Sequence, residues 1–169
     1  MSIKGLFLAA AITFSAHFAY AQDQKVAYID AEAIIKVMPD YKRIESDLTS
    51  YKKVLEKQLQ AEEKKVQDYY TSVMQQAQAG TMSPKQQQEA EAKLMEMQQT
   101  LQQKALDADE QLVKKEQSLT KPLYDKFNAA VKTVAESNGY NYIFDKKMML
   151  TTDGGIDATA KLKTQLGIQ

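Results

Sequence analysis

Apolar residues recur every three or four positions through the central stretch of the chain, residues 40–138. This spacing is typical of amphipathic helices, and the stretch is otherwise rich in Lys, Glu, Gln, Ala and Leu, which favour helices. Its one glycine, Gly80, lies near the middle beside Pro84, and the only other proline is Pro122. The pattern predicts a long helical hairpin over residues 40–138, with its tip at about residues 79–84.

The apolar positions also predict how the two helices pack against each other. Tyr41 to Leu55 follow an a/d heptad pattern, and the series resumes at Leu59, one position late. Such a shift relaxes the supercoil locally. The series in the second helix continues to its end: Leu94, Met97, Leu101, Ala105, Ala108, Leu112, Leu119, Leu123, Phe127, Ala130 and Val134.

Local signals mark the start of the second helix and a break within it. Ser83 is a good N-cap, Pro84 suits the first helical position, and Gln86 completes a capping box. Pro122 lies inside the helix, so we expect a kink there.

The segment before the hairpin predicts a strand and a short helix. Residues 25–30 alternate in polarity and contain residues that favour strands. Asp30 can cap a helix that runs to about Val37, and Pro39 suits the first position of the long helix that follows.

The segment after the hairpin predicts a β-hairpin and a last helix. Gly139 ends the long helix. Residues 140–145 and 147–152 are expected to form two strands joined by a tight turn, and Asp157 to cap a helix through Leu166. The fold class is therefore mainly α with a small β body, formed by residues 22–39 and 139–169.

A body of this size is too small to be stable alone. Domains of about 60 residues bury little surface, and a short open sheet exposes unpaired edges. We therefore expect several chains to pool their strands into one closed β body from which the helical arms project. The residues predicted to form this oligomerisation body are Val26, Tyr28, Ile143 and Phe144.

Residues 1–21 are predicted to be a cleaved secretory leader. Lys4 is followed by an apolar run over residues 6–18, and Ala19-Tyr20-Ala21 supplies the small-x-small pattern of a cleavage site after Ala21. A transmembrane anchor is the alternative, but it normally requires about 20 apolar residues. The prediction places the mature chain outside the cytoplasm.

Composition excludes most catalytic chemistry. The chain has no Cys and no Trp, and its one histidine, His17, lies in the predicted leader. Without that leader and its Lys4, one of 22 basic residues, the net charge is −1 against 22 acidic residues. We therefore expect no catalytic residues, no metal, no cofactor and no nucleic-acid partner. Residues 153–157 could suggest a calcium loop, but they lack its further ligands and fit a turn followed by an N-cap.

The far end of the hairpin differs in composition from the helices that carry it. Residues 69–103 contain ten Gln and only five charged side chains. Methionine side chains adapt to irregular apolar partners, so this region is expected to bind varied apolar partners. The alternative is that its apolar residues continue the interhelical seam, which is favoured for Met74 and Met97. The candidate binding residues are Tyr69, Tyr70, Met74, Met82, Met95 and Met97.

The order of these elements resembles the OmpH/Skp family of periplasmic chaperones across about residues 25–169. The similarity lies in the 25–30 strand, the hairpin, the 138–145 segment and the last capped helix. The pieces Tyr28-Ile29-Asp30, Met38-Pro39-Asp40-Tyr41 and Asn138-Gly139-Tyr140 look most like the Bacteroidetes-type branch.

The resemblance implies a homotrimer with a β-barrel body and three helical tentacles around a cavity. In that cavity the family holds unfolded outer-membrane proteins in the periplasm without ATP. The best-known members are strongly basic, and this chain is not, so binding of lipopolysaccharide or anionic lipid is not carried over. A structural or adaptor coiled coil with one fixed partner in the envelope is the alternative function.

Overall fold

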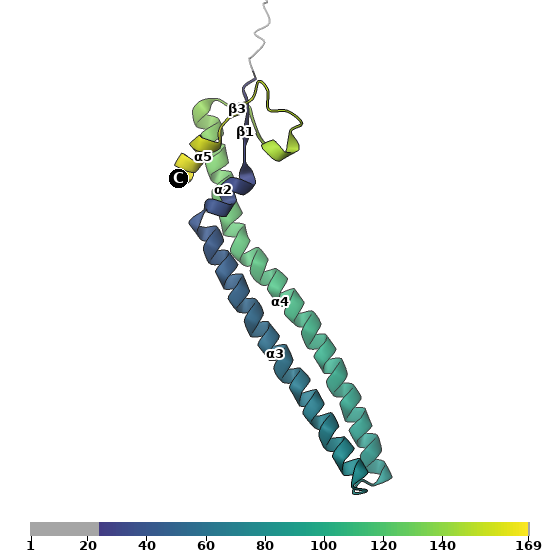
Figure 1. Ribbon diagram of the computed structural model, residues 1–169. Coiled ribbons are helices and arrows are strands. Elements are labelled where there is room, and N and C mark those ends of the chain that lie inside the picture. Colours follow the sequence, from purple (N-terminus) through teal and green to yellow (C-terminus); the bar gives the residue numbers. More distant parts are fainter. Residues whose placement is uncertain (1–23, 169) are drawn as a thin grey trace, which may run out of the picture.

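Two long helices lie side by side and form an arm that projects from a small body (Figure 1). The computed structural model describes residues 24–168, so the leader predicted for residues 1–21 lies outside the described residues. The arm consists of α3 (Pro39–Gln78) and α4 (Pro84–Asn138). The body contains β1 (Val26–Ile29), α2 (Ala31–Val37), β2 (Tyr142–Asp145), the 3₁₀ helix η2 (Lys146–Met148), β3 (Ile156–Asp157) and α5 (Thr159–Leu166).

Local hydrogen bonds set the ends of α4. The amide of Gln86 donates to Ser83 Oγ at 3.3 Å, and the amide of Ser83 donates to Gln86 Oε1 at 2.8 Å. This reciprocal pair confirms the predicted capping box. Gly139 ends the helix at φ 67°, a left-handed conformation that glycine adopts without a steric cost. The helix continues through Pro122, and its ribbon changes direction between the body and the arm (Figure 1).

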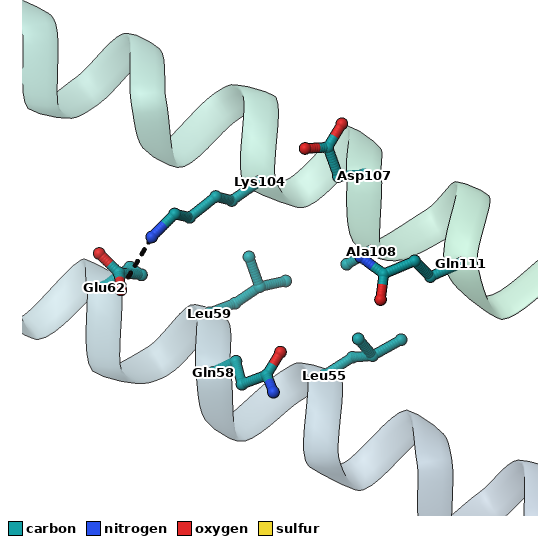
Figure 2. Close-up of a pocket in the computed structure, with 8 residues that line it drawn as sticks. All are labelled: Leu55, Gln58, Leu59, Glu62, Lys104, Asp107, Ala108 and Gln111. Carbon is teal, nitrogen blue, oxygen red and sulfur yellow. Dashed lines mark ion pairs between the residues drawn. The ribbon is translucent and has the colours of Figure 1, made fainter.

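The seam between α3 and α4 is narrow. Leu55 and Leu59 of α3 both point toward α4, opposite Ala108 (Figure 2), which agrees with the seam shift predicted at these residues. The alanine is too small to fill the space, and a cavity of about 300 Å³ remains between the helices. Outside the body, the interior of the arm is therefore loosely packed.

The sheet differs from the predicted one. Its strand order is β2-β1-β3, and both outer strands run parallel to β1. The first of the two expected strands, over 140–145, is present as β2, whereas the second strand over 147–152 and its antiparallel pairing with the first are wrong. The Asp145 carboxylate accepts a hydrogen bond from the amide of Lys147 at 3.0 Å, which turns the chain into η2 where the second strand was expected. The sheet does not close within one chain.

The core lies between one face of the sheet and the helices of the body. Ala27 and Ile29 of β1 are buried against α2, the last turns of α4 and α5. The largest fully buried side chains here are Ile34, Met38 and Leu162. The two ends of the chain thus share one core with the base of the arm.

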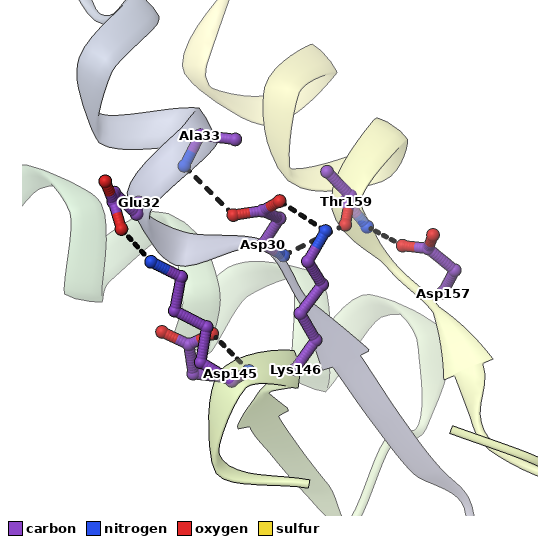
Figure 3. A network of polar contacts seen from close by, with 8 residues as sticks. Asp30, Glu32, Ala33, Asp145, Lys146, Asp157 and Thr159 are labelled. Carbon is purple, nitrogen blue, oxygen red and sulfur yellow. Dashed lines mark hydrogen bonds and ion pairs between the residues drawn. The ribbon is translucent and has the colours of Figure 1, made fainter. Parts of the chain in front are cut away.

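A polar network joins three segments of the body around Asp30 (Figure 3). Asp30 caps α2 by accepting from the amide of Ala33 at 3.0 Å, and Lys146 Nζ lies 2.5 Å from its other carboxylate oxygen. The amide of Asp30 donates to Thr159 Oγ1 at 3.2 Å at the start of α5. Lys147 of η2 pairs with Glu32 of α2. The network fastens η2 and α5 to the beginning of α2.

Asp30 and Lys146 shift each other's pKa in opposite directions. The hydrogen bond from Lys146, followed by that from Ala33, holds the pKa of Asp30 below its ordinary 3.8. The same pair raises the pKa of Lys146 above 10.5. A lowered carboxylate pKa contributes stability above the unfolded pKa, and this contribution is lost as the pH falls through the folded pKa.

Replacing Asp30 with Asn should keep the N-cap and remove the ion pair. We expect Asp30→Asn to be less stable than the wild type at neutral pH, with the difference disappearing as the pH falls below the ordinary Asp value of 3.8. Urea unfolding across this pH range, at one protein concentration, measures the difference. Asp47→Asn, at an exposed carboxylate of α3 outside the network, is the control. A difference between Asp30→Asn and the wild type that persists at low pH would contradict the account.

Candidate binding face of the arm

The described residues show neither a metal-binding cluster nor a buried polar group. Within residues 24–168, no three acidic, His or Cys side chains gather where a metal could bind. In the same range no polar or charged residue is buried, and no helix is both long and apolar enough to cross a bilayer. The candidate site is therefore a surface of apolar side chains.

A stripe of exposed apolar side chains runs along α4. Met95, Leu106, Val113 and Tyr124 follow one another at spacings of 11, 7 and 11 residues. At about 100° per residue they fall within about 20° of one direction, and at 1.5 Å per residue they span about 44 Å. Leu106 and Met95 are 64% and 61% exposed. The stripe lies beside the seam, not in it.

Two grooves open on the same side of the arm as this stripe. The groove at the tip has a volume of about 380 Å³ and includes Glu91, one helical turn before Met95. Its other lining residues are Tyr70, Val73, Met74, Ala77, Met82, Gln87, Ala90 and Leu94. The groove at the base measures about 400 Å³ and is lined by Tyr124, at the other end of the stripe, together with Tyr41 and Leu48 of α3.

These features form one surface, which we name the apolar face. It comprises the stripe Met95, Leu106, Val113 and Tyr124 and the two large apolar residues that the tip groove exposes, Tyr70 and Met74. Only one charged side chain, Glu91, lines the tip groove. The apolar face can therefore contact an extended apolar segment along most of the arm.

The opposite side of the arm is polar. Glu62 pairs with Lys65 at 2.8 Å and with Lys104 across the seam at 3.0 Å (Figure 2). Hydrogen bonds from Lys65 and then Lys104 hold the pKa of Glu62 below its ordinary value. Further toward the body, the Tyr51 hydroxyl donates to Gln111 Oε1 at 3.2 Å. Val54 is exposed on this side, one turn before Gln58, which lines the same cavity as Glu62 and Lys104.

The six residues predicted to bind clients do not form one site. Tyr70, Met74 and Met82 line the tip groove together, and Met95 lies exposed on the same face. Met74 is therefore a groove residue, although the seam was favoured for it. Tyr69 is half-buried, and Met97 lines a separate groove on the polar side with Glu62, Lys93 and Glu96.

Three residues of the stripe were not predicted from the sequence: Leu106, Val113 and Tyr124. Each lies outside the heptad seam, and the composition of the tip could not identify them because they lie nearer the body. Their 11-7-11 spacing was a detectable signal, because apolar residues repeated at that spacing share one side of a helix.

A second exposed surface lies on the sheet. Val26 and Tyr28 alternate with the buried residues of β1 and point away from the core, beside Tyr142 and Phe144 in register. The Tyr142 and Phe144 rings stack with their centroids 6.1 Å apart. Ile143, also predicted for oligomerisation, packs against the core of its own chain. Three of the four predicted residues thus share the open face of the sheet.

Comparison with known proteins identifies this architecture. Residues 25–166 match the family model described as outer membrane protein (OmpH-like). No curated protein matches the chain in sequence. Among solved structures, the chain is similar to a protein from Caulobacter crescentus CB15 that is described as an OmpH-like outer membrane chaperone. The two share 13% identity and superpose with a TM-score of 0.71 over 83% of this chain and 82% of that one.

Proposed function

This chain belongs to the OmpH-like family, and we propose that it is an ATP-independent chaperone that holds unfolded outer-membrane proteins in the periplasm. The family supports a chaperone role. The observation that carries the specific proposal is the apolar face, which exposes large apolar side chains along most of an otherwise polar arm.

The length and composition of the apolar face suit an unfolded membrane β-strand. A transmembrane strand has about 9–11 residues with apolar side chains on alternate positions, and it spans about 30 Å when extended. The stripe on α4 is about 44 Å long, so one strand can contact several of its side chains at once. Each contact is weak, but together they lower the concentration of free client that could aggregate.

The grooves add adaptable contacts at both ends of the stripe. Met74 and Met82 offer flexible, polarisable side chains at the tip, and Tyr41 and Tyr124 offer aromatic surface at the base. Few charges oppose an apolar client at the tip, and this favours binding of varied sequences over binding of one fixed partner.

The open face of the sheet supports assembly through the body. Tyr142 and Phe144 are both exposed in the single chain, and its three strands leave the sheet unclosed. We propose that three copies cover these faces in a closed β body and that the apolar faces of the three arms turn toward a shared cavity. A leader cleaved after Ala21 would deliver the chain to the periplasm.

Removing the stripe should weaken client holding without disturbing the fold. The variant Met95→Ser, Leu106→Ser, Val113→Ser changes three exposed residues, so we expect a large loss of protection and little change in melting temperature. Light scattering of a urea-denatured outer-membrane β-barrel protein, diluted into buffer with each variant, measures protection.

Val54→Ser is the matched control, because Val54 is similarly exposed on the polar side. It should protect as well as the wild type. Equal protection by the stripe variant and the wild type would rule out the apolar face as the holding surface. Capture of one stoichiometric partner in place of many outer-membrane proteins would favour an adaptor.

Charge on the open face of the sheet should prevent assembly. Tyr142→Asp with Phe144→Asp places two carboxylates where the proposed interface would bury them, at a cost of several kcal/mol per charge. Sedimentation equilibrium should give three times the chain mass for the wild type and the single-chain mass for the variant. A monomeric wild type at micromolar concentration would contradict the proposed assembly.

A further inference from the structure

We propose that the thioethers of Met74, Met82 and Met95 at the end of the arm are oxidation sites, and that their conversion to sulfoxides by peroxide releases clients. The consequence for clients rests on the proposed function, whereas the modification itself does not. The oxidant is a hydroperoxide such as hydrogen peroxide.

The structure gives these three sulfurs a common, accessible place. Met74 and Met82 line the tip groove, and Met95 stands beside it with 61% of its surface exposed. Met38 provides the contrast, because it is 1% exposed within the core of the body. The chain contains no Cys and no Trp, so methionine is its most readily oxidised side chain outside the predicted leader.

The reaction needs no group from the protein beyond the sulfur. A sulfur lone pair attacks one oxygen of hydrogen peroxide, the O–O bond breaks, and that oxygen is transferred to sulfur. The sulfur is oxidised by two electrons, and the second oxygen leaves as water after a proton shifts to it. The product is methionine sulfoxide, which reductases return to the thioether.

Oxidation changes the part of the arm that depends most on apolar contact. A sulfoxide is polar and chiral, so it disrupts a Met-rich binding surface. Within the tip groove, two of the nine lining residues are methionine. Because these side chains contribute little to the core, the arm should stay folded while its affinity for clients falls. We expect the Kd of an extended apolar client peptide to rise about ten-fold, equivalent to about 1.4 kcal/mol.

Peptide mass mapping after graded hydrogen peroxide treatment of the full chain tests the sites. The exposed Met148 of the body and Met95 should gain one oxygen first, Met74 and then Met82 next, and Met38 last. Oxidation of Met38 at the same rate as Met95, or a tip that stays unmodified, would overturn the assignment.

A comparison of client protection before and after peroxide treatment tests whether oxidation releases clients. The client is the denatured outer-membrane β-barrel protein. Oxidised wild type should protect about ten-fold less well per chain, consistent with the weaker Kd. Treatment with methionine sulfoxide reductases should restore protection. Unchanged protection by fully tip-oxidised protein would overturn the proposed release.

Leucine substitutions locate the effect. The variant Met74→Leu, Met82→Leu, Met95→Leu has no thioether at these sites, so peroxide should not lower its protection below the level of the same variant before treatment. Met148→Leu is the matched control, because it removes an exposed thioether from the body, and it should stay peroxide-sensitive. Sensitivity of the triple variant equal to that of the wild type would overturn the proposal. If the wild type does not protect clients even before oxidation, only the proposed function is contradicted. The mass map would still show whether the three methionines are the oxidation sites.

Discussion

Two helices packed side by side bury only one stripe of residues on each, and every other feature of the arm depends on that constraint. Beyond the body, the buried apolar residues of the arm within the described part of the chain are Leu55, Ala90 and Ala108. The surface ion pairs along the helices add little stability. The arm therefore relies on helix-favouring composition and good caps, and most of its surface remains available for contacts with other molecules.

The two sides of the arm expose different kinds of side chain. One side carries the stripe from Met95 to Tyr124 with a groove at each end, and the other carries the Glu62–Lys104 pair and the Tyr51–Gln111 hydrogen bond. A coiled-coil spacer would need neither the stripe nor the difference between the sides. The body anchors this arrangement, because the base of α4 shares its core with β1 and α5.

The features that depend on neighbouring residues could be predicted from the sequence. The two long helices, the Ser83 capping box and the Asp30 cap all follow from patterns within one or two helical turns. The pairing of β1 with β2 could not be predicted in this way, because the whole arm lies between the two strands in the sequence. The paired residues Tyr28 and Phe144 are 116 positions apart. Residues 147–152 were expected to form a strand, but the turn at Asp145 removes them from the sheet. Within the candidate site, the composition of residues 69–103 predicted the tip groove. The stripe could be predicted only from the spacing of apolar residues that lie outside the seam.

The most direct test of the account is site-specific photo-crosslinking of a denatured outer-membrane protein to the arm. A photoreactive amino acid at Leu106 samples the apolar face, and the same group at Val54 samples the polar side. The two positions adjoin Ala108 and Leu55, which lie opposite each other across the seam (Figure 2). The account predicts strong crosslinks from position 106 and few from position 54. Equal crosslinking from both positions would contradict the central claim that one face of the arm holds the client.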